Sequence, residues 1–370
     1  MVKKKILYLM HVDWKWIFQR PHVIAKGLEK DYDVTVAYLF NYRQQRKMQK
    51  NNLLPQKTVK IYNIPYEGKN IFIYYLNKVW LRWYRHKFKR EMYDIVWLTS
   101  PVMLRYIDKK MSGKMVYDCM DDEVAMRMDR DNTKLVDQLV LKNEYVRNKK
   151  ILLKRADFVF FSSQYLYIKF KQQCNGKAML VRNGFQQSAI HYMEKKAEMK
   201  RRQYHIGYVG TIESWLDINL LKKGISKYPN ICYHLIGPCA IPIKNTNNII
   251  IEGVTEHDQL YYKIAEYDCL IMPFKVNDII LAVDPVKLYE YISYGKCIIS
   301  VYYPEIERFS DFVYFYHTEE EFISLLKKLK ERKFVPKYSS EQQIQFLYEN
   351  TWEKRINTIK NVIDESGGDI

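Results

Sequence analysis

The stretch Tyr267-Asp-Cys-Leu-Ile-Met-Pro-Phe-Lys275, followed by Asp284-Pro-Val-Lys-Leu-Tyr-Glu-Tyr-Ile-Ser-Tyr-Gly-Lys-Cys-Ile-Ile-Ser300, decides the fold of this chain. The first segment predicts a buried strand, and the second predicts a helix that begins at Asp-Pro and ends at Gly295, then another strand. This order is one βαβ unit of a parallel sheet. Lys287 and Glu290 lie one turn apart near the positive helix N-terminus, where open α/β sheets bind nucleotides.

Length and composition favour a two-domain α/β protein. The chain has 370 residues, and 48% of them are hydrophobic, which excludes a disordered chain. No apolar run is long enough to span a membrane, and the one after Lys3-Lys-Lys5 is too short for a signal peptide. We therefore expect a cytoplasmic protein.

Charge is distributed unevenly along the chain. Residues 1–204 hold 42 Lys and Arg against 19 Asp and Glu, which leaves 18 basic and 23 acidic residues for 205–370. A basic half indicates an anionic partner, such as nucleic acid, phospholipid head groups or a phosphorylated substrate. The alternative is a solvated Lys-rich surface with no specific partner.

The six cysteines are scattered, with no Cys-x-x-Cys pair and no histidines clustered around them. This spacing predicts reduced core or strand residues, with no metal site and no disulfide framework. The cysteines are Cys119, Cys174, Cys232, Cys239, Cys269 and Cys297.

The N-terminal half opens as a nucleotide-binding fold. Residues 5–10 and 33–39 predict strands, with a helix from Pro21 between them. The glycine-rich dinucleotide fingerprint is missing, which argues against a dehydrogenase.

Residues 76–92 predict an amphipathic helix with an apolar stripe and basic flanks. The stripe comprises Leu76, Trp80, Tyr84 and Phe88, and the flanks comprise Arg82, Arg85, Lys89 and Arg90. Such a helix lies in an anionic membrane interface, or packs in a core with snorkelling basic neighbours. On the first interpretation, Trp80, Arg82, Trp83 and Arg85 contact the membrane.

A carboxylate cluster, Asp121-Asp122-Glu123, follows the predicted strand 115–119. One interpretation is a solvated helix N-terminus, which favours acids electrostatically. The other is a catalytic base that faces a cleft between the two domains, carried by Asp121 or Asp122.

The second domain is expected to begin at Tyr204, after a polar linker at 186–203. Its first strand ends in Gly207-Tyr-Val-Gly-Thr211. Gly210 would let backbone amides approach a ligand closely.

Six motifs in order give the chain a resemblance to the GT-B glycosyltransferases, and to the family 4 type of bacterial capsule, teichuronic acid and exopolysaccharide clusters. They are Trp16-x-x-x-Arg20-Pro-His, Tyr117-Asp-Cys-Met-Asp-Asp122, Glu144 with Leu152-Leu-Lys-Arg-Ala-Asp157, Gly207-Tyr-Val-Gly-Thr211, Asp268-Cys-Leu-Ile-Met-Pro-Phe274 and Asp284-Pro-Val-Lys-Leu-Tyr-Glu-Tyr. The resemblance implies two Rossmann-like domains that face a cleft. Residues 1–188 would bind the acceptor, 203–345 would bind the nucleotide sugar, and a helix at 346–366 would pack back on the first domain.

The resemblance also implies roles for single residues. Gly210 and Thr211 would meet the donor diphosphate, Val254 would lie near the base, and Glu290 would bind the ribose. Asp284 and Lys287 would lie by the sugar and the phosphates, and Arg20 and Arg182 are further cations for phosphate. No cofactor and no metal are expected, because helix dipoles and cations can stabilise the departing diphosphate.

One position departs from the family signature, which has two glutamates with seven residues between them. Ala282 stands where the first is expected, and Asp284 is the candidate to replace it. The donor sugar and the stereochemistry therefore stay open. A base on the acceptor hydroxyl, Asp121 or Asp122, would make the displacement direct and inverting, whereas a retaining enzyme would need no such base.

The first hypothesis is a peripheral enzyme at the inner face of the cell membrane, which moves a sugar from a UDP-sugar to a lipid-linked or polysaccharide acceptor. A sugar-nucleotide epimerase of the same fold is the alternative. A basic nucleic-acid-binding protein is the alternative from another class, but no recognition-helix or RNA-binding motif supports it, so we expect no nucleic acid.

Overall fold

A computed structural model describes residues 3–40, 54–65, 67, 70–108, 111, 113–128, 140–186, 203–255, 257–331 and 333–365. The chain divides into two units, residues 1–182 with 352–370 and residues 183–351. The predicted linker at 186–203 lies almost wholly outside the described residues.

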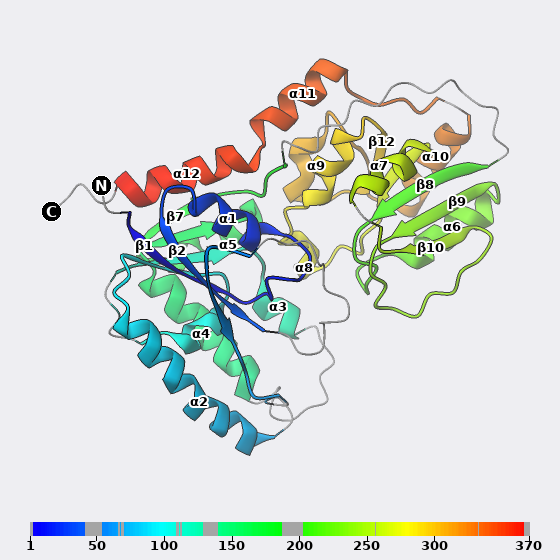
Figure 1. Ribbon diagram of the computed structural model, residues 1–370. Helices are drawn as coiled ribbons and strands as arrows, with labels where there is room; N and C mark the ends of the chain where they lie inside the picture. The colour runs from blue at the N-terminus through cyan, green and yellow to red at the C-terminus, as the bar shows by residue number, and fades with distance from the viewer. Residues whose placement is uncertain are drawn as a thin grey trace. The chain divides into compact units, whose positions relative to one another are not determined.

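Unit 1 is built on a parallel sheet whose described strands run in the order β3-β2-β1-β4-β5-β6-β7 (Figure 1). The order reverses between β1 and β4, so the carboxyl ends of these strands form a switch point where α/β folds bind ligands. The strands are β1 Lys5–Met10, β2 Asp33–Leu39, β3 Lys57–Ile61, β4 Ile95–Leu98, β5 Lys114–Cys119, β6 Phe158–Phe161 and β7 Lys177–Leu180.

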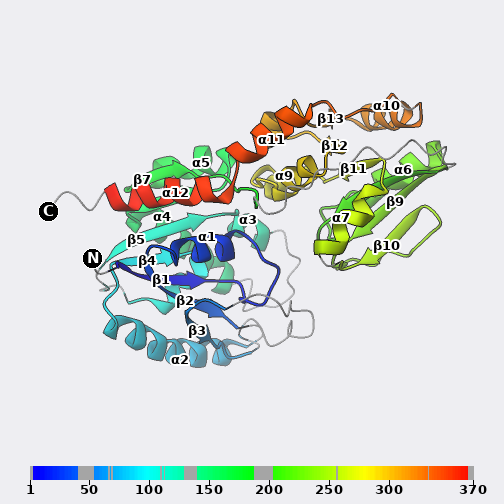
Figure 2. The same cartoon turned by 45° about the horizontal axis from the view of Figure 1, so that its top comes forward.

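Helices cover both faces of this sheet. Figure 2 shows α1 and α12 together on one face and α2 on the other. The helices are α1 Arg20–Leu28, α2 Ile71–Arg90, α3 Glu123–Met128, α4 Lys142–Arg155, α5 Gln164–Phe170 and α12 Trp352–Glu365, with 3-10 turns η2 Pro101–Tyr106 and η4 Lys171–Gln173.

The last helix, α12, returns to unit 1 and packs against α1. The contact is so close that a Cβ on Gly27 would lie 2.2 Å from Cδ1 of Ile356. Ile359 is fully buried in the same core as Ile24 and Trp97. Burial of this apolar stripe holds the C-terminal end of the chain on the first unit.

A buried ionic network ties α2, η2 and α4 together on the other face. Arg105 forks onto Glu144, with Nε to Oε1 at 3.0 Å and Nη2 to Oε2 at 2.5 Å. Tyr74 donates to the same carboxylate at 3.0 Å, and Arg105 also pairs with Glu67 at 2.8 Å. Because each charge has a partner, the network can be buried between the helices.

Unit 2 repeats the layered design with described strands in the order β10-β9-β8-β11-β12-β13. The strands are β8 Tyr204–Val209, β9 Ile231–Ile236, β10 Ile249–Gly253, β11 Cys269–Met272, β12 Cys297–Val301 and β13 Tyr314–Tyr316. The helices are α6 Ile218–Lys227, α7 His257–Ala265, α8 Asp278–Leu281, α9 Val286–Ser293, α10 Glu319–Lys330 and α11 Ser340–Glu349, with the 3-10 turn η6 Pro304–Phe309. Helix α6 packs on α10, and α9 packs on α11.

The predicted βαβ unit of the opening stretch is β11, α9 and β12, and β11 pairs with β12 in parallel. Gly295, with φ +63°, follows the end of α9 as expected. Strand β3 was not predicted, because its Lys57-Thr-Val-Lys-Ile61 pattern is polar and lies at a sheet edge. The predicted helix over 135–156 is described from residue 140 on, and its first residues lie outside the described part.

Candidate functional site

Two glycines form a cradle at the carboxyl ends of β8 and β9. Gly210 has φ +143° and Gly237 has φ +138°, conformations that favour glycine. A Cβ on Gly237 would lie 2.1 Å from the carbonyl oxygen of Gly210, so the two backbones touch. The missing side chains make room for the stem of Lys287 at Gly210 and for the Gly210 carbonyl at Gly237. Gly237 was not predicted, although an Ile-Gly-Pro sequence after a strand was its signal.

Lys287 lies directly over this cradle. A Cβ on Gly210 would fall 2.0 Å from Cε and 2.6 Å from Nζ of Lys287, so the lysine stem crosses the glycine backbone. The amino group lies 5.9 Å from the ring centroids of both Tyr208 and Phe274. Among the described residues it has no carboxylate within ion-pair distance. Burial lowers the pKa of Lys287, and the charge of Glu290 partly opposes this shift. An arriving anion would stabilise the charged form.

Glu290 lies one turn further along α9 and is partly exposed. Thr211 follows Gly210 and is also partly exposed, with its carbonyl oxygen held by the Tyr208 hydroxyl at 2.8 Å. Val254 follows β10 and is 70% exposed. The structure thus brings Gly210, Thr211 and Lys287 together and puts Val254 at the same edge of the sheet.

Asp284 is a structural residue, which corrects the expectation that it lies by the donor sugar. Its side chain is fully buried and pairs with Arg308. Its other oxygen accepts from the backbone N–H of Asn183 at 2.6 Å, and the Asn183 side chain donates to the Asp284 carbonyl at 2.7 Å. Ala282 is also buried. Neither position therefore offers a carboxylate to a ligand.

Asp121 and Asp122 follow β5, and their pKa values are shifted in opposite directions. Asp122 is buried, where desolvation raises its pKa, but Lys149 at 2.9 Å and Lys169 at 3.0 Å outweigh that and hold the pKa below its usual value. Burial raises the pKa of Asp121 to about 7. The nearby charges of Asp118 and Asp122 raise this pKa further, whereas the charge of Arg20 lowers it. The described residues give its carboxylate no hydrogen bond or ion pair.

This contrast assigns different roles to the two acids. Asp122 is engaged by Lys149 and Lys169, and its lowered pKa makes it a weaker base than Asp121. Asp121 changes protonation near neutral pH, which suits a general base.

Arg20 is not available to a phosphate, which corrects the expectation for this residue. It is 3% exposed and forks onto Asp118, with Nε to Oδ1 at 3.0 Å and Nη2 to Oδ1 at 2.7 Å. Its Nη1 donates to the carbonyl of Val181 at 2.7 Å. Arg182 is partly exposed after β7, and its role stays a prediction.

His11 lies at the same sheet edge as Asp121 and was not predicted. It follows β1, and its Nδ1 lies 2.8 Å from the Thr99 hydroxyl oxygen after β4. Burial lowers the pKa of His11 to about 4, with a smaller contribution from His22. The ring is therefore neutral at pH 7 and can exchange hydrogen bonds with a ligand. Its signal in the sequence was its place directly after a strand.

The solvent face of α2 carries an unusual run of apolar side chains, each between 44% and 66% exposed. They are Ile71, Phe72, Tyr75, Leu76, Val79, Trp80 and Trp83. The buried face is instead formed by Tyr74, Asn77, Leu81, Tyr84 and Phe88. Of the predicted stripe, Tyr84 and Phe88 are therefore buried, whereas Leu76 and Trp80 lie outside the core.

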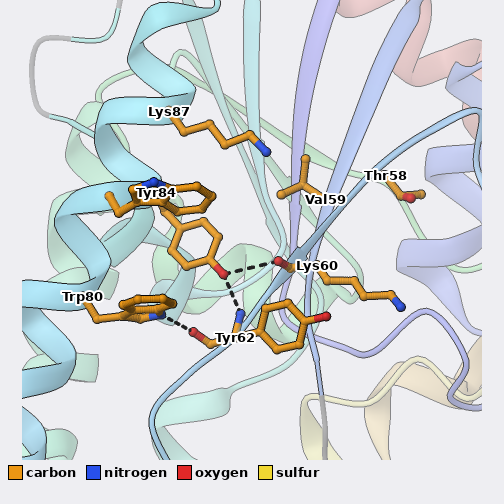
Figure 3. Close-up of a pocket in the computed structure, with 8 residues that line it drawn as sticks. Thr58, Val59, Lys60, Tyr62, Trp80, Tyr84 and Lys87 are labelled. Carbon is orange, nitrogen blue, oxygen red and sulfur yellow. Dashed lines mark hydrogen bonds between the residues drawn. The ribbon is translucent and has the colours of Figure 1, made fainter.

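A groove of about 580 Å³ lies between this helix and β3 (Figure 3). Trp80 forms part of its wall and donates from Nε1 to the Tyr62 carbonyl at 2.8 Å. The lining residues are Thr58, Val59, Lys60, Tyr62, Trp80, Trp83, Tyr84 and Lys87. Arg82 is exposed beside it, whereas Arg85 is partly buried and donates to the Arg105 carbonyl at 2.7 Å.

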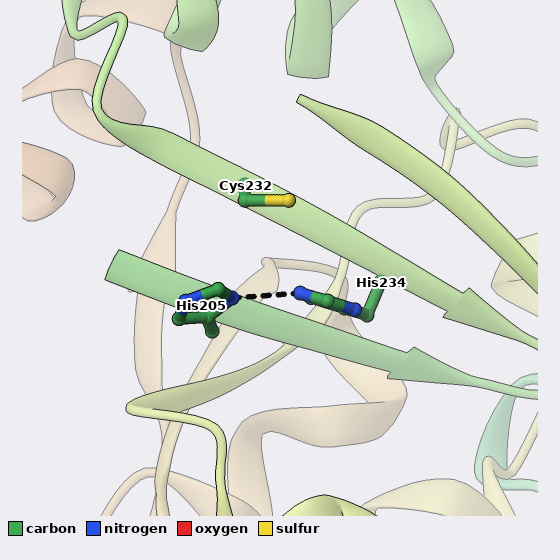
Figure 4. Close-up of side chains that lie close together, drawn as sticks. All are labelled: His205, Cys232 and His234. Carbon is green, nitrogen blue, oxygen red and sulfur yellow. Dashed lines mark hydrogen bonds between the residues drawn. The ribbon is translucent and has the colours of Figure 1, made fainter. Parts of the chain in front are cut away.

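The expectation that no histidine clusters around a cysteine is wrong for Cys232. Adjacent strands bring His205, Cys232 and His234 together on unit 2, with their ligand atoms within 4.8 Å of one another (Figure 4). His205 and Cys232 are register partners although 27 residues separate them in the sequence. All six cysteines are free thiols, as predicted, but Cys174 and Cys239 lie outside the buried core and the strands.

Comparisons with solved structures match nearly the whole chain. Sucrose-phosphate synthase from Thermosynechococcus elongatus has a TM-score of 0.72 at 10% identity, covering 98% of this chain and 99% of that one. The chain has the GT-B fold. HepE of Anabaena, solved with UDP, has a TM-score of 0.68 at 12% identity, covering 98% and 100%. WaaG, a glycosyltransferase involved in lipopolysaccharide biosynthesis, has a TM-score of 0.66 at 13% identity, covering 97% and 99%.

Comparison of sequences finds only distant similarity. No family model matches the chain. TuaH of Bacillus subtilis (strain 168), a protein assigned to teichuronic acid biosynthesis as a glycosyltransferase, is 23% identical over 230 residues. The match covers 58% of this GT-B chain and 56% of TuaH, so the chain spans just over half the length of that relative. None of the described helices is both long and apolar enough to cross a bilayer.

Proposed function

We propose that this chain is a glycosyltransferase that moves a sugar from a UDP-sugar to a lipid-linked or polysaccharide acceptor in bacterial cell-surface glycan synthesis. The observation that carries the proposal is the cradle of Gly210 and Gly237 beneath the amino group of Lys287. Bare backbone, a lysine and the N-terminus of α9 at one place suit a diphosphate.

The donor would be held by unit 2. Gly210, Thr211 and Lys287 would bind the diphosphate, Val254 would cover the base, and Glu290 would accept hydrogen bonds from the ribose hydroxyls. Lys287 and the helix dipole would stabilise the charge that develops on the leaving diphosphate, so this site needs no metal for that step. HepE, with the same fold, has been solved with UDP and with UDP-glucose, which supports the choice of nucleotide.

Asp121 is the proposed base of unit 1. It would take the proton from the acceptor hydroxyl as the oxygen attacks the anomeric carbon. The bond from that carbon to the diphosphate then breaks, and UDP leaves with the electron pair. This displacement inverts the anomeric configuration.

The α2 face is the proposed membrane contact. Exposed aromatic and aliphatic side chains suit the interfacial region of a bilayer, and Arg82, Lys89 and Arg90 add positive charge on the same helix. TuaH is described as acting in teichuronic acid biosynthesis and WaaG in lipopolysaccharide biosynthesis, which supports a lipid-linked or polysaccharide acceptor.

A panel of sugar nucleotides tests the proposal. The purified chain should gain thermal stability with UDP-sugars and UDP, because a ligand that binds the folded state shifts unfolding. Glu290→Ala should lose this gain while its unliganded melting temperature stays close to that of the wild type. No stabilisation by any nucleotide would refute the proposal.

Product analysis distinguishes the alternatives within the fold. A transferase releases UDP only with an acceptor or water, whereas an epimerase alters the sugar and needs no acceptor. Binding of nucleic acid in preference to sugar nucleotides would contradict the proposal altogether.

A further inference from the structure

The cluster of His205, Cys232 and His234 lies apart from the donor cradle in unit 2. Its residues are the second residue of β8 and the second and fourth of β9, whereas Gly210 and Gly237 follow the last residues of the same strands. Residues paired in a parallel register put their side chains on the same face, so both histidines and the cysteine share one face. Rigid paired strands therefore supply all three groups.

The hydrogen bonds of His234 indicate which of its two ring nitrogens is unprotonated. Its Nδ1 lies 2.7 Å from Oε1 of Glu252, and a carboxylate only accepts, so the proton is on Nδ1. The lone pair of Nε2 then points to Nδ1 of His205, 2.8 Å away. His234 thus presents a ligand lone pair toward His205 and Cys232, with its opposite nitrogen tied to a carboxylate.

Surrounding residues hold this arrangement. Glu252 is fixed by the Tyr267 hydroxyl at 2.8 Å and by Lys263. The Tyr267 ring stacks on His234 with centroids 4.8 Å apart. A Cβ on Gly207 would lie 2.3 Å from the Tyr267 ring, so a glycine at this strand position makes room for that ring. Such carboxylate–histidine pairs orient histidine ligands in metal centres.

We propose that His205, Cys232 and His234 bind one zinc ion on unit 2, with water as a fourth ligand. Two imidazoles and a thiolate are a donor set that zinc prefers, and partial exposure of His205 gives the ion a path from solvent. Binding releases the thiol proton of Cys232. His205 shifts its proton from Nδ1 to Nε2, so that both imidazoles coordinate as neutral groups.

With three protein ligands, the ion would keep its fourth position open to water. It would link β8 directly to β9, and it would be connected to β10 through the hydrogen bond between His234 and Glu252. The site lies near the amino-terminal ends of β8 and β9. Zinc held there touches none of the groups proposed for the donor or for proton transfer, so binding and transferase activity are separable.

Cobalt(II) is the probe for this site, because it replaces zinc and gives an absorption band when a thiolate coordinates it. Titration of the metal-free, full-length chain should give a thiolate-to-cobalt charge-transfer band that saturates at one ion per chain and disappears when zinc is added. Cys232→Ser should abolish the band, and His234→Gln should weaken cobalt binding at least tenfold. Glu252→Gln should lower cobalt affinity about 10- to 100-fold, as loss of an orienting carboxylate does.

Cys239→Ser is the matched control, because Cys239 is the exposed cysteine and so the most accessible competing thiol. It should keep the full band. Circular dichroism of each variant checks that unit 2 stays folded, and Cys232→Ser keeps a small polar side chain for that reason. A band that survives Cys232→Ser in a folded protein, a band lost in Cys239→Ser, or no saturation at one equivalent would overturn the site.

Discussion

Asp121 and Asp122 are adjacent carboxylates whose surroundings give them opposite properties. Two lysines keep Asp122 ionised, while burial raises the pKa of Asp121 to about 7. Sequence alone placed both acids at the end of a strand but did not separate them, because Lys149 and Lys169 come from helices far along the chain. The distinction therefore needed tertiary structure.

Asp121→Asn should lower the turnover number roughly 10²- to 10⁴-fold, the usual contribution of a general base. Since the base works when deprotonated, wild-type turnover should rise with pH through about 7, and the variant should lose this limb. Steady-state kinetics with a UDP-sugar and acceptor between pH 5.5 and 8.5 measure both effects. An unchanged pH profile would show that another group takes the proton.

Stability provides a second check on Asp121. Its pKa is raised in the folded state from 3.8 to about 7, so the folded state binds the proton more tightly than the unfolded one. This contribution to stability is fully present below pH 3.8 and is lost as pH rises through about 7. The stability of Asp121→Asn should therefore not fall in this way as the pH rises through about 7. Asp122→Asn should instead destabilise the fold, because it removes the ion-pair partner of buried Lys149.

At the scale of elements, α12 shows how a sequence-distant helix completes a domain. Its apolar side chains Ile356, Ile359 and Val362 pack in the core of unit 1, and Lys4 and Tyr32 bond to Asp364 near its end. The sequence predicted such a returning helix through its family resemblance. The hydrophobic periodicity of this helix did not by itself show which of the two sheets the helix would cover.

Ile359→Ala should lower the free energy of unfolding of unit 1 by about 2–5 kcal/mol, because it opens a cavity in a fully buried site. Asn361→Ala, on the exposed side of the same helix, is the control and should change it by less than about 0.5 kcal/mol. Urea unfolding followed by tryptophan fluorescence measures the difference. Equal stability of the two variants would mean that α12 is not part of the cooperative unit.

The α2 face should bind anionic membranes. Phe72→Ser together with Trp83→Ser removes exposed apolar area and should weaken binding to phosphatidylglycerol vesicles, measured by sedimentation, at least tenfold. The control replaces Ile168 and Tyr262, which are equally exposed elsewhere, and should bind as the wild type does. Equal weakening in both variants would argue against a specific role for α2.

At the scale of the whole molecule, the basic residues concentrate in the N-terminal half. Binding to anionic vesicles should therefore weaken steeply as salt rises, because salt screens exposed charges over about 8–10 Å at physiological strength. Binding to neutral phosphatidylcholine vesicles should be weak and nearly independent of salt. Co-sedimentation across a salt series measures this, and salt-independent binding to the anionic vesicles would contradict an electrostatic contact.

Much of the architecture could be predicted from local pattern. The βαβ unit of β11, α9 and β12 was legible because buried strands, an Asp-Pro helix start and Gly295 are all local signals. Edge strand β3 was missed because its exposed lysines break the alternation, and the buried pairs of Arg20 and Asp284 were missed because their partners are distant in sequence. Ion pairs between residues that are distant in sequence cannot be predicted from one sequence, whereas hydrophobic periodicity can.

The central claim is that Lys287 above the glycine cradle binds the diphosphate of a UDP-sugar. Calorimetric titration of UDP into the wild type, Lys287→Met and Lys222→Met tests it most directly, since methionine keeps the stem but removes the charge, and Lys222 is an exposed lysine of α6. We predict that Lys287→Met weakens UDP binding roughly 10- to 100-fold, as loss of a charged hydrogen bond does, while Lys222→Met binds as the wild type does. Unchanged affinity in a folded Lys287→Met protein would contradict the account.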